Sequence, residues 1–262
     1  MHTFSIHSRY TDYTYKINIY CPALSSPAQD LPVLYVLDGL YYFPLLQNAI
    51  QLQSRNAPKT DVQEAIVVGI YHDKDDIHER RFYDFTAPAK SYAYPPRMEH
   101  RTFRKVGGAE NFHLFLEEEL KPQIQNRFHV NQQQQSIFGH SLSGYFVLWH
   151  LLKHGNFQHS IAISPSIWWN NYELLAMKLA LQEAKPSLFL SVGEKEGFMV
   201  EDSQRFFTQI PTDSLNCTFY IANDENHASI VPTVMSKALR FIFIQQIFSC
   251  TESKAAGTED SY

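Results

Sequence analysis

The sequence predicts an α/β protein with a mostly parallel central sheet flanked by helices. Two observations support this fold class. Segments typical of buried strands alternate with segments of helical periodicity along most of the 262 residues, and such alternation is typical of a parallel sheet covered by helices on both faces. The composition, with 44% hydrophobic and 19% charged residues, is that of an ordinary globular chain long enough to bury a large core.

The first half of the chain contains three expected strands and a helix. Residues 13–20 (YTYKINIY) alternate polar and apolar side chains, as an exposed antiparallel strand does. Residues 31–39 (LPVLYVLDG) and 64–70 (EAIVVGI) are short apolar runs, which indicate strands buried on both faces. Residues 110–124 (ENFHLFLEEELKPQI) have apolar side chains at helical spacing, and Pro122 is expected to kink that helix.

The second half of the chain continues the alternation of strands and helices without a linker that would divide it. The expected elements are, in order, a strand at 136–138, a helix at 144–154, a strand at 160–164, a helix at 172–184, a strand at 187–193, a helix at 199–210, a strand at 215–222 and a helix at 231–248. We therefore expect a single domain over residues 1–250. The polar, small-residue segment 251–262 is expected to be a disordered tail.

One segment, residues 71–106, interrupts the alternation. It is too long for a simple connection, and loops of this length are usually functional or disordered. Its aromatic residues, among them Tyr92 and Tyr94, favour an ordered flap. Its charged stretch HDKDDIHE has neither the His-x-x-x-His spacing of zinc proteases nor the glycine of a calcium loop, so we expect a solvated loop and no metal site.

The hexamer GHSLSG (139–144) joins a predicted strand to a predicted helix, and this context favours a nucleophilic serine. In a nucleophile elbow, small residues two before and two after the serine let the backbone turn sharply and expose the hydroxyl. Gly139 and Ser143 stand at these positions around Ser141. Ser141 is therefore the candidate nucleophile. Ser143 is the weaker candidate, because no small residue stands two positions after it.

A serine hydroxyl needs a base, and the base needs an acid that orients it. His227 follows the last predicted strand and is the candidate base, whereas His140 points elsewhere on an elbow and is a poorer one. The loop after residues 187–193 offers Glu196, which we favour as the acid. The alternatives for the acid are Glu194, Asp202 and Asp224.

The oxyanion of an ester hydrolysis is stabilised by two backbone N–H donors. One is expected from Leu142, directly after the nucleophile. The other is expected from Leu40, in the turn after the strand LYVLDG, where Gly39 lets the backbone approach the reacting carbonyl.

With these residues placed, the chain resembles the esterase branch of the α/β-hydrolases that includes enterochelin (siderophore) esterases, esterase D and the mycolyltransferases, over about residues 3–248. The segments that carry the resemblance are VLYVLDGLYYF, RRFYDFTAP, GHSLSG, AISPSIWW, VGEKE and ENHASIVP. It implies the α/β-hydrolase fold, with Ser141 as nucleophile, His227 as base and a glutamate of VGEKE as acid. Ser143 stands where the family often has glycine. A serine at this position is more similar to the mycolyltransferase version.

The expected function is that of a serine carboxylic-ester hydrolase acting through an acyl-enzyme, on a bulky aromatic or siderophore-type (catecholate) ester. The residues expected to bind substrate are Tyr41, Arg81, Trp168 and Trp169. The alternatives are a general carboxylesterase or thioesterase without a dedicated substrate, and a protein of this fold that binds without catalysis.

Charge and composition indicate the expected partners and location. The formal net charge is -5 and no Lys/Arg cluster stands out, which argues against nucleic acid. The apolar runs are too short to span a bilayer, and three separated cysteines make no disulfide framework. The first residues lack the apolar core of a signal peptide. We expect a cytoplasmic protein that acts on a small-molecule ester without a cofactor.

Overall fold

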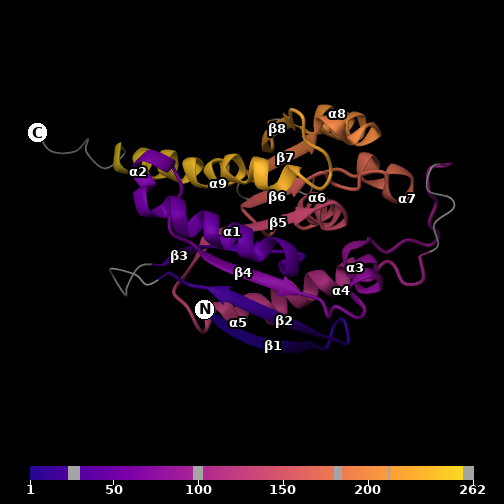
Figure 1. The fold of residues 1–262 in the computed structure, drawn as a ribbon, viewed down its shortest axis with the longest axis horizontal. Coiled ribbons are helices and arrows are strands. Elements are labelled where there is room, and N and C mark those ends of the chain that lie inside the picture. Colours follow the sequence, from indigo (N-terminus) through magenta and orange to yellow (C-terminus); the bar gives the residue numbers. More distant parts are fainter. Residues whose placement is uncertain (23–29, 97–102, 180–184, 212, 256–262) are drawn as a thin grey trace, which may run out of the picture.

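The computed structural model describes residues 1–22, 30–96, 103–179, 185–211 and 213–255, with the backbone alone for residues 244–255. Its centre is an eight-stranded sheet in the order β1-β2-β4-β3-β5-β6-β7-β8 (Figure 1). The strands are β1 (His2–Ser8), β2 (Tyr13–Tyr20), β3 (Leu31–Val36), β4 (Ile66–Tyr71), β5 (Val130–His140), β6 (His159–Ile163), β7 (Ser187–Gly193) and β8 (Asn216–Ala222).

The pairing of the strands confirms the mostly parallel sheet. All pairs from β4 through β8 are parallel. β1 and β2 form an antiparallel hairpin that joins the edge at β4, also antiparallel. β2 is the alternating segment that the sequence predicts to be antiparallel, and it buries Tyr15, Ile17 and Ile19 on one face. The carboxyl ends of the parallel strands therefore lie along one edge of the sheet, where ligands bind in such folds.

Helices cover both faces of the sheet (Figure 1). They are α1 (Gly39–Gln53), α2 (Ala57–Thr60), α3 (Ile77–Phe85), α4 (Ala109–Leu114), α5 (Lys121–Gln125), α6 (Leu142–Lys153), α7 (Trp169–Tyr172), α8 (Phe198–Gln209) and α9 (Ile230–Ala255). α1 and α9 share one apolar core with one face of the sheet. α3 to α6 and α8 share the other core with the opposite face.

The helix predicted over residues 172–184 is wrong. The chain forms only the short α7 and a 3₁₀ turn at Glu173–Ala176, and residues 180–184 lie outside the described part. The backbone gives the reason at both ends: Tyr172 has a positive φ and cannot begin a right-handed helix, and Met177 is extended (φ -80°, ψ 149°), which ends the turn after Ala176. Leu174, Leu175, Met177 and Leu179 of this segment line a pocket instead.

Two other expectations are modified in detail. The helix expected at 110–124 runs through α4, a π-helical segment at Phe115–Leu120 and α5. The π-helical segment ends two residues before Pro122, which has no N–H to bond the carbonyl four residues earlier. α9 continues to Ala255, five residues into the expected tail, and residues 256–262 lie outside the described part. Among the described helices, none is both long enough and apolar enough to cross a bilayer.

Candidate active site

Ser141 occupies the sharp turn between β5 and α6. Its φ of 59° and ψ of -116° lie outside the conformations that non-glycine residues ordinarily adopt. The surrounding backbone holds this conformation: Ser141 N–H donates to the Ile163 carbonyl at 3.0 Å, and Ser141 O accepts from Ser166 N–H at 3.0 Å. A strained serine at this position matches the nucleophile elbow that the sequence predicts.

The glycines beside the serine are required by close backbone contacts. A Cβ on Gly139 would lie 2.3 Å from the carbonyl oxygen of Ser143, and one on Gly144 would lie 3.1 Å from that of Ile163. The first distance is impossible for a real side chain. The close approach of the Ser143 carbonyl is therefore the physical reason for a small residue two positions before Ser141.

His227 and Glu196 form a hydrogen-bonded pair. His227 Nδ1 lies 2.6 Å from Glu196 Oε2. Glu196 Oε1 accepts from the Ser164 hydroxyl at 2.5 Å and from Gly193 N–H at 2.7 Å. The carboxylate is 1% exposed and the imidazole 43%. Burial alone would raise the pKa of Glu196, but these hydrogen bonds outweigh burial and lower it. The carboxylate therefore stays ionised beside the imidazole.

Four loops at the carboxyl ends of β5 to β8 bring these residues together. Backbone hydrogen bonds join the loops at Ser141–Ile163, Ser164–Ser191 and Lys195–Glu225. The ring of His227 lies against that of His140, the residue before Ser141, with centroids 4.5 Å apart. The predicted base and acid thus meet each other and lie beside the elbow.

The other acids considered for the triad have different partners. Glu194 accepts the backbone N–H of Asp224 at 2.9 Å. Asp224 pairs with Lys195 at 3.0 Å and its side chain is 87% exposed. Asp202 is buried on α8. Of these candidates, Glu196 is the one described in contact with His227.

The two predicted oxyanion donors stand in comparable positions. Leu40 lies in the first turn of α1 and Leu142 in the first turn of α6. The first four amides of a helix have no intrahelical carbonyl to bond, and both leucines stand among these positions. Asp38, just before α1, has a φ of 53° and turns the chain at this point.

Asp38, whose carboxylate is buried, forms an ion pair at this turn. Arg81 binds Asp38 through two nitrogen atoms, with Nε to Oδ1 at 2.6 Å and Nη2 to Oδ2 at 2.9 Å. Arg81 is expected from the sequence to bind substrate, but the structure gives its guanidinium a partner within the protein. Asp38 and Ser164 are not predicted from the sequence as part of the site. The signal available for both is their position within two residues of the end of a strand, at the carboxyl edge of the sheet.

The aromatic residues proposed for a substrate pocket fall into two groups. Tyr41 is 57% exposed at the start of α1. Trp169 is fully buried and its ring contacts those of Phe82, Tyr94 and Phe103. Trp168 is also buried and lies edge-on to Trp169. Trp169 thus holds the described part of the 71–106 segment against the core, and in this conformation it offers no surface to a substrate.

Replacing Trp169 with phenylalanine should therefore lower stability without changing substrate preference. Removing part of a fully buried ring should reduce the free energy of unfolding by about 1–3 kcal/mol. The values of kcat/KM for acetyl and aryl esters should change in parallel. Urea denaturation and assays on both ester classes measure this. A loss confined to aryl esters, with stability unchanged, would return Trp169 to the substrate pocket.

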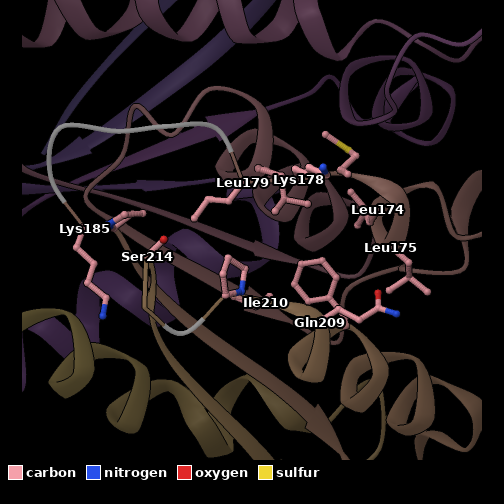
Figure 2. A pocket seen from close by; sticks show the side chains of 13 residues that line it. Leu174, Leu175, Lys178, Leu179, Lys185, Gln209, Ile210 and Ser214 are labelled. Atoms are coloured by element: carbon pink, nitrogen blue, oxygen red, sulfur yellow. The ribbon is translucent and has the colours of Figure 1, made fainter.

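A cavity of about 670 Å³ has a mainly apolar lining (Figure 2). Leu174, Met177 and Leu179 line it, with Lys178 and Lys185 among the lining residues. Pro186 and Ser214, also in its wall, precede β7 and β8, so the cavity lies toward the amino ends of these strands. Ser141, His227 and Glu196 do not contribute to its lining.

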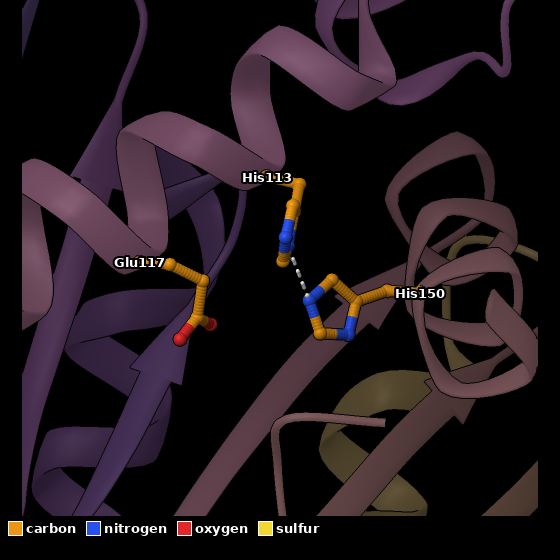
Figure 3. Close-up of side chains that lie close together, drawn as sticks. All are labelled: His113, Glu117 and His150. Atoms are coloured by element: carbon orange, nitrogen blue, oxygen red, sulfur yellow. Dashed lines mark hydrogen bonds between the residues drawn. The ribbon is translucent and has the colours of Figure 1, made fainter. Parts of the chain in front are cut away.

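In the described residues, side chains that could ligate a metal converge at His113, Glu117 and His150, outside the HDKDDIHE stretch (Figure 3). His113 Nδ1 lies 3.0 Å from His150 Nε2. Burial lowers the pKa of His113 to about 4, so this ring is neutral near pH 7. Glu117 pairs with Lys121 Nζ at 2.5 Å, which supplies the carboxylate with its counter-charge. The cluster links α4 and the π-helical segment to α6.

The fold and the site together define a serine hydrolase of the α/β-hydrolase class. The chain belongs to the family described as Putative esterase, whose profile matches residues 8–230. It is 35% identical over 249 residues to ferri-bacillibactin esterase BesA of Bacillus subtilis (strain 168), covering 89% of this chain and 86% of that protein. It is 24% identical to the siderophore enterobactin esterase of Emericella nidulans, covering 88% and 90% of the two chains.

Solved structures agree with this assignment. The crystal structure of BES protein from Bacillus cereus superposes with a TM-score of 0.81 at 37% identity, covering 92% of this chain and 95% of that one. The α/β-hydrolase fold predicted from the sequence is confirmed, and the protein is a carboxylic-ester hydrolase.

Proposed function

We propose that the protein hydrolyses the ester bonds of a siderophore, with Ser141 as nucleophile, His227 as general base and Glu196 as the orienting acid. The observation that carries this proposal is the hydrogen bond between a buried carboxylate and a half-exposed imidazole beside a strained serine, in a chain 35% identical to a ferri-bacillibactin esterase. Siderophore esters join hydroxamate or catecholate chelating units, and their hydrolysis weakens the chelate.

In the proposed reaction, Ser141 Oγ attacks the ester carbonyl carbon while His227 accepts the hydroxyl proton. The carbon–oxygen bond to the alcohol then breaks, and His227 returns the proton to the departing alcohol. Water attacks the acyl-enzyme by the same steps, releases the acid and restores Ser141. Glu196 holds the imidazole in the tautomer that presents Nε2 to the serine, because Nδ1 donates to the carboxylate.

The amides of Leu40 and Leu142 are proposed to bind the oxyanion in both steps. Tyr41 follows Leu40 and exposes more than half of its surface beside this turn. An exposed ring at this place can stack on a flat catechol group, and such a contact is worth about 0.5–1.5 kcal/mol beyond area burial. We therefore propose a catecholate ester as the preferred class of substrate.

A comparison of substrates tests this proposal. A catecholate trilactone, p-nitrophenyl acetate and an acyl thioester are assayed with the same enzyme preparation, and the trilactone products are separated by liquid chromatography. We expect kcat/KM for the trilactone to exceed that for the acetyl ester by at least about 100-fold, the discrimination that a fitted pocket supplies. Equal values across the three substrates would favour a general carboxylesterase or thioesterase.

The proposed substrate also implies a partner class and a place. A small-molecule ester, and not nucleic acid, fits a chain of formal net charge -5 without a basic cluster. A siderophore that delivers iron is opened where the iron is used, so we propose a cytoplasmic location. Cell fractionation followed by immunoblotting tests this, and recovery in the periplasm or medium would contradict it.

The pH dependence of kcat/KM should report a single ionisation. Activity should rise with pH, because the base must lose its proton before it can accept that of Ser141. Burial, with a smaller contribution from the nearby His227, lowers the pKa of His140 to about 3, so His140 stays neutral. Hydrogen bonds from His227, Ser164 and Gly193 outweigh burial and lower the pKa of Glu196, which keeps its carboxylate ionised while the base titrates.

A profile with p-nitrophenyl acetate between about pH 5 and pH 9 measures this expectation. One ascending limb is expected. Two ascending ionisations in this range would mean that a second group, such as His140, titrates with the base.

A further inference from the structure

The two proposed oxyanion amides lie on separate loops, so something must fix the distance between them. β3 and β5 are paired as far as Val36 and Phe138, and Leu37 N–H still donates to the Phe138 carbonyl at 3.0 Å. Beyond this point each chain turns into its own helix, α1 or α6. No further backbone hydrogen bond between the two turns is described, and side chains bridge them instead.

The first bridge joins Ser143 to Asp38. Ser143 Oγ lies 2.7 Å from Asp38 Oδ2, and both side chains are buried. The hydroxyl also accepts the N–H of His140 at 2.9 Å, so it is fixed from the elbow side as well. Arg81 holds the same carboxylate through two hydrogen bonds. Hydrogen bonds to a charged, buried partner are stronger than those between neutral groups.

The second bridge joins Tyr42 to His140. Tyr42 Oη lies 2.8 Å from His140 Nδ1, and the two rings meet edge to face with centroids 5.5 Å apart. Burial, reinforced by the charge of Asp38, raises the pKa of Tyr42 to about 12, so the phenol keeps its proton. The bond therefore persists across the working range of pH.

The positions of these bridges in the sequence are informative. Asp38 and Tyr42 stand two residues before and two residues after Leu40. His140 and Ser143 stand on either side of Leu142. Each amide is thus bracketed by the two residues that bind across to the other loop.

We propose that the Ser143–Asp38 and Tyr42–His140 hydrogen bonds are two latches that set the separation of the Leu40 and Leu142 amides, which makes Ser143 and Tyr42 positioning residues for oxyanion stabilisation. This inference rests on the proposed roles of Ser141, Leu40 and Leu142, but not on the siderophore as substrate. Donors in an oxyanion hole must lie about 2.7–3.1 Å from the charge that develops, and a displacement of about 1 Å can cost a hundredfold in rate.

The latch at Ser143 can be removed by a small substitution. Glycine is frequent at this position in the family that the sequence resembles, and glycine has no hydroxyl to bind Asp38. Ser143→Gly therefore removes the latch and leaves a residue that the elbow of this fold accommodates. Arg81 continues to pair with Asp38 in that variant, so the carboxylate is not left without a partner.

The test compares latch variants with matched controls. Ser143→Gly and Tyr42→Phe should each lower kcat for p-nitrophenyl acetate by about tenfold to a hundredfold, with KM nearly unchanged. Ser203→Gly and Tyr35→Phe are the controls. Each removes a buried hydroxyl that has no hydrogen-bond partner in the described structure, and each should leave kcat unchanged.

A second measurement separates loss of oxyanion geometry from general destabilisation. The ratio of kcat/KM for p-nitrophenyl acetate to that for p-nitrophenyl thionoacetate measures how well the site fits oxygen, because sulfur is larger and a weaker hydrogen-bond acceptor. The ratio should fall in both latch variants and stay constant in the controls. Unchanged kcat, or a constant ratio with lower kcat, would overturn the proposal.

The pH profile tests another explanation for a lower kcat in Tyr42→Phe, namely a change in the base His227. His140 touches His227, so the variant could act through the base. A shift in the midpoint of the kcat/KM profile would show this and overturn the second latch, whereas an unchanged midpoint supports it. The latches are tested with acetyl esters, whereas the substrate class is tested with the catecholate trilactone. A trilactone that does not react would therefore contradict the substrate proposal without affecting the test of the latches.

Discussion

Ser141→Ala should fold normally and lose almost all esterase turnover. Removal of the nucleophile from a serine triad lowers kcat by about 10³–10⁶-fold and leaves only the catalysis that oxyanion binding and substrate binding provide. Alanine has the same Cβ as serine, so the strained backbone with φ of 59° is no less favourable in the variant. Steady-state assays with p-nitrophenyl acetate and a thermal melt measure both expectations.

Ser143→Ala is the matched comparison, because it removes the other hydroxyl of the same hexamer. Its kcat should fall only by the factor of about ten to a hundred expected for a lost latch. A fluorophosphonate probe should still label this variant, and the labelled peptide should carry the probe on Ser141. An inactive, unlabelled Ser143→Ala beside an active Ser141→Ala would exchange the roles of the two serines.

Much of this site could be predicted because its signals are local. The elbow depends on small residues within six positions, and the contact between Gly139 and the Ser143 carbonyl expresses that requirement directly. His227 and Glu196 follow consecutive parallel strands, whose carboxyl ends must lie at one edge of the sheet. Because the two strands are neighbours in the sheet, the loops that carry His227 and Glu196 lie side by side whatever their side chains are.

The features that escaped prediction depend on contacts between distant segments or on backbone geometry. Asp38 and Ser143 are 105 residues apart, and no pattern around either one reveals the other. The apolar periodicity of residues 172–184 predicts a helix, yet Tyr172 has a positive φ and the backbone is extended again at Met177. Trp169 follows a strand as a pocket residue could, but the aromatic side chains of the flap bury it.

Glu196→Gln should have an effect almost as large as loss of the serine. Glu196 is nearly fully buried and bonded to His227 at 2.6 Å. A glutamine amide can offer N–H to Nδ1 and so favour the wrong tautomer, in which Nε2 carries the proton and cannot act as a base. An amide in place of the triad carboxylate lowers kcat by about 10⁴-fold in a comparable enzyme, and we expect about 10³–10⁴-fold here.

Glu194→Gln is the control in the same turn. Glu194 is exposed and accepts the backbone N–H of Asp224, a bond that glutamine can also accept through its amide oxygen. Its kcat should stay within about twofold of the parent value, since surface substitutions change free energies by about 0.5 kcal/mol or less. The kcat values of both variants, measured with p-nitrophenyl acetate at a pH above the ascending limb, decide the assignment. Small and equal effects would transfer the acid role from Glu196 to Asp224 or Asp202, because the imidazole would then be held by a carboxylate other than the one it meets in this structure.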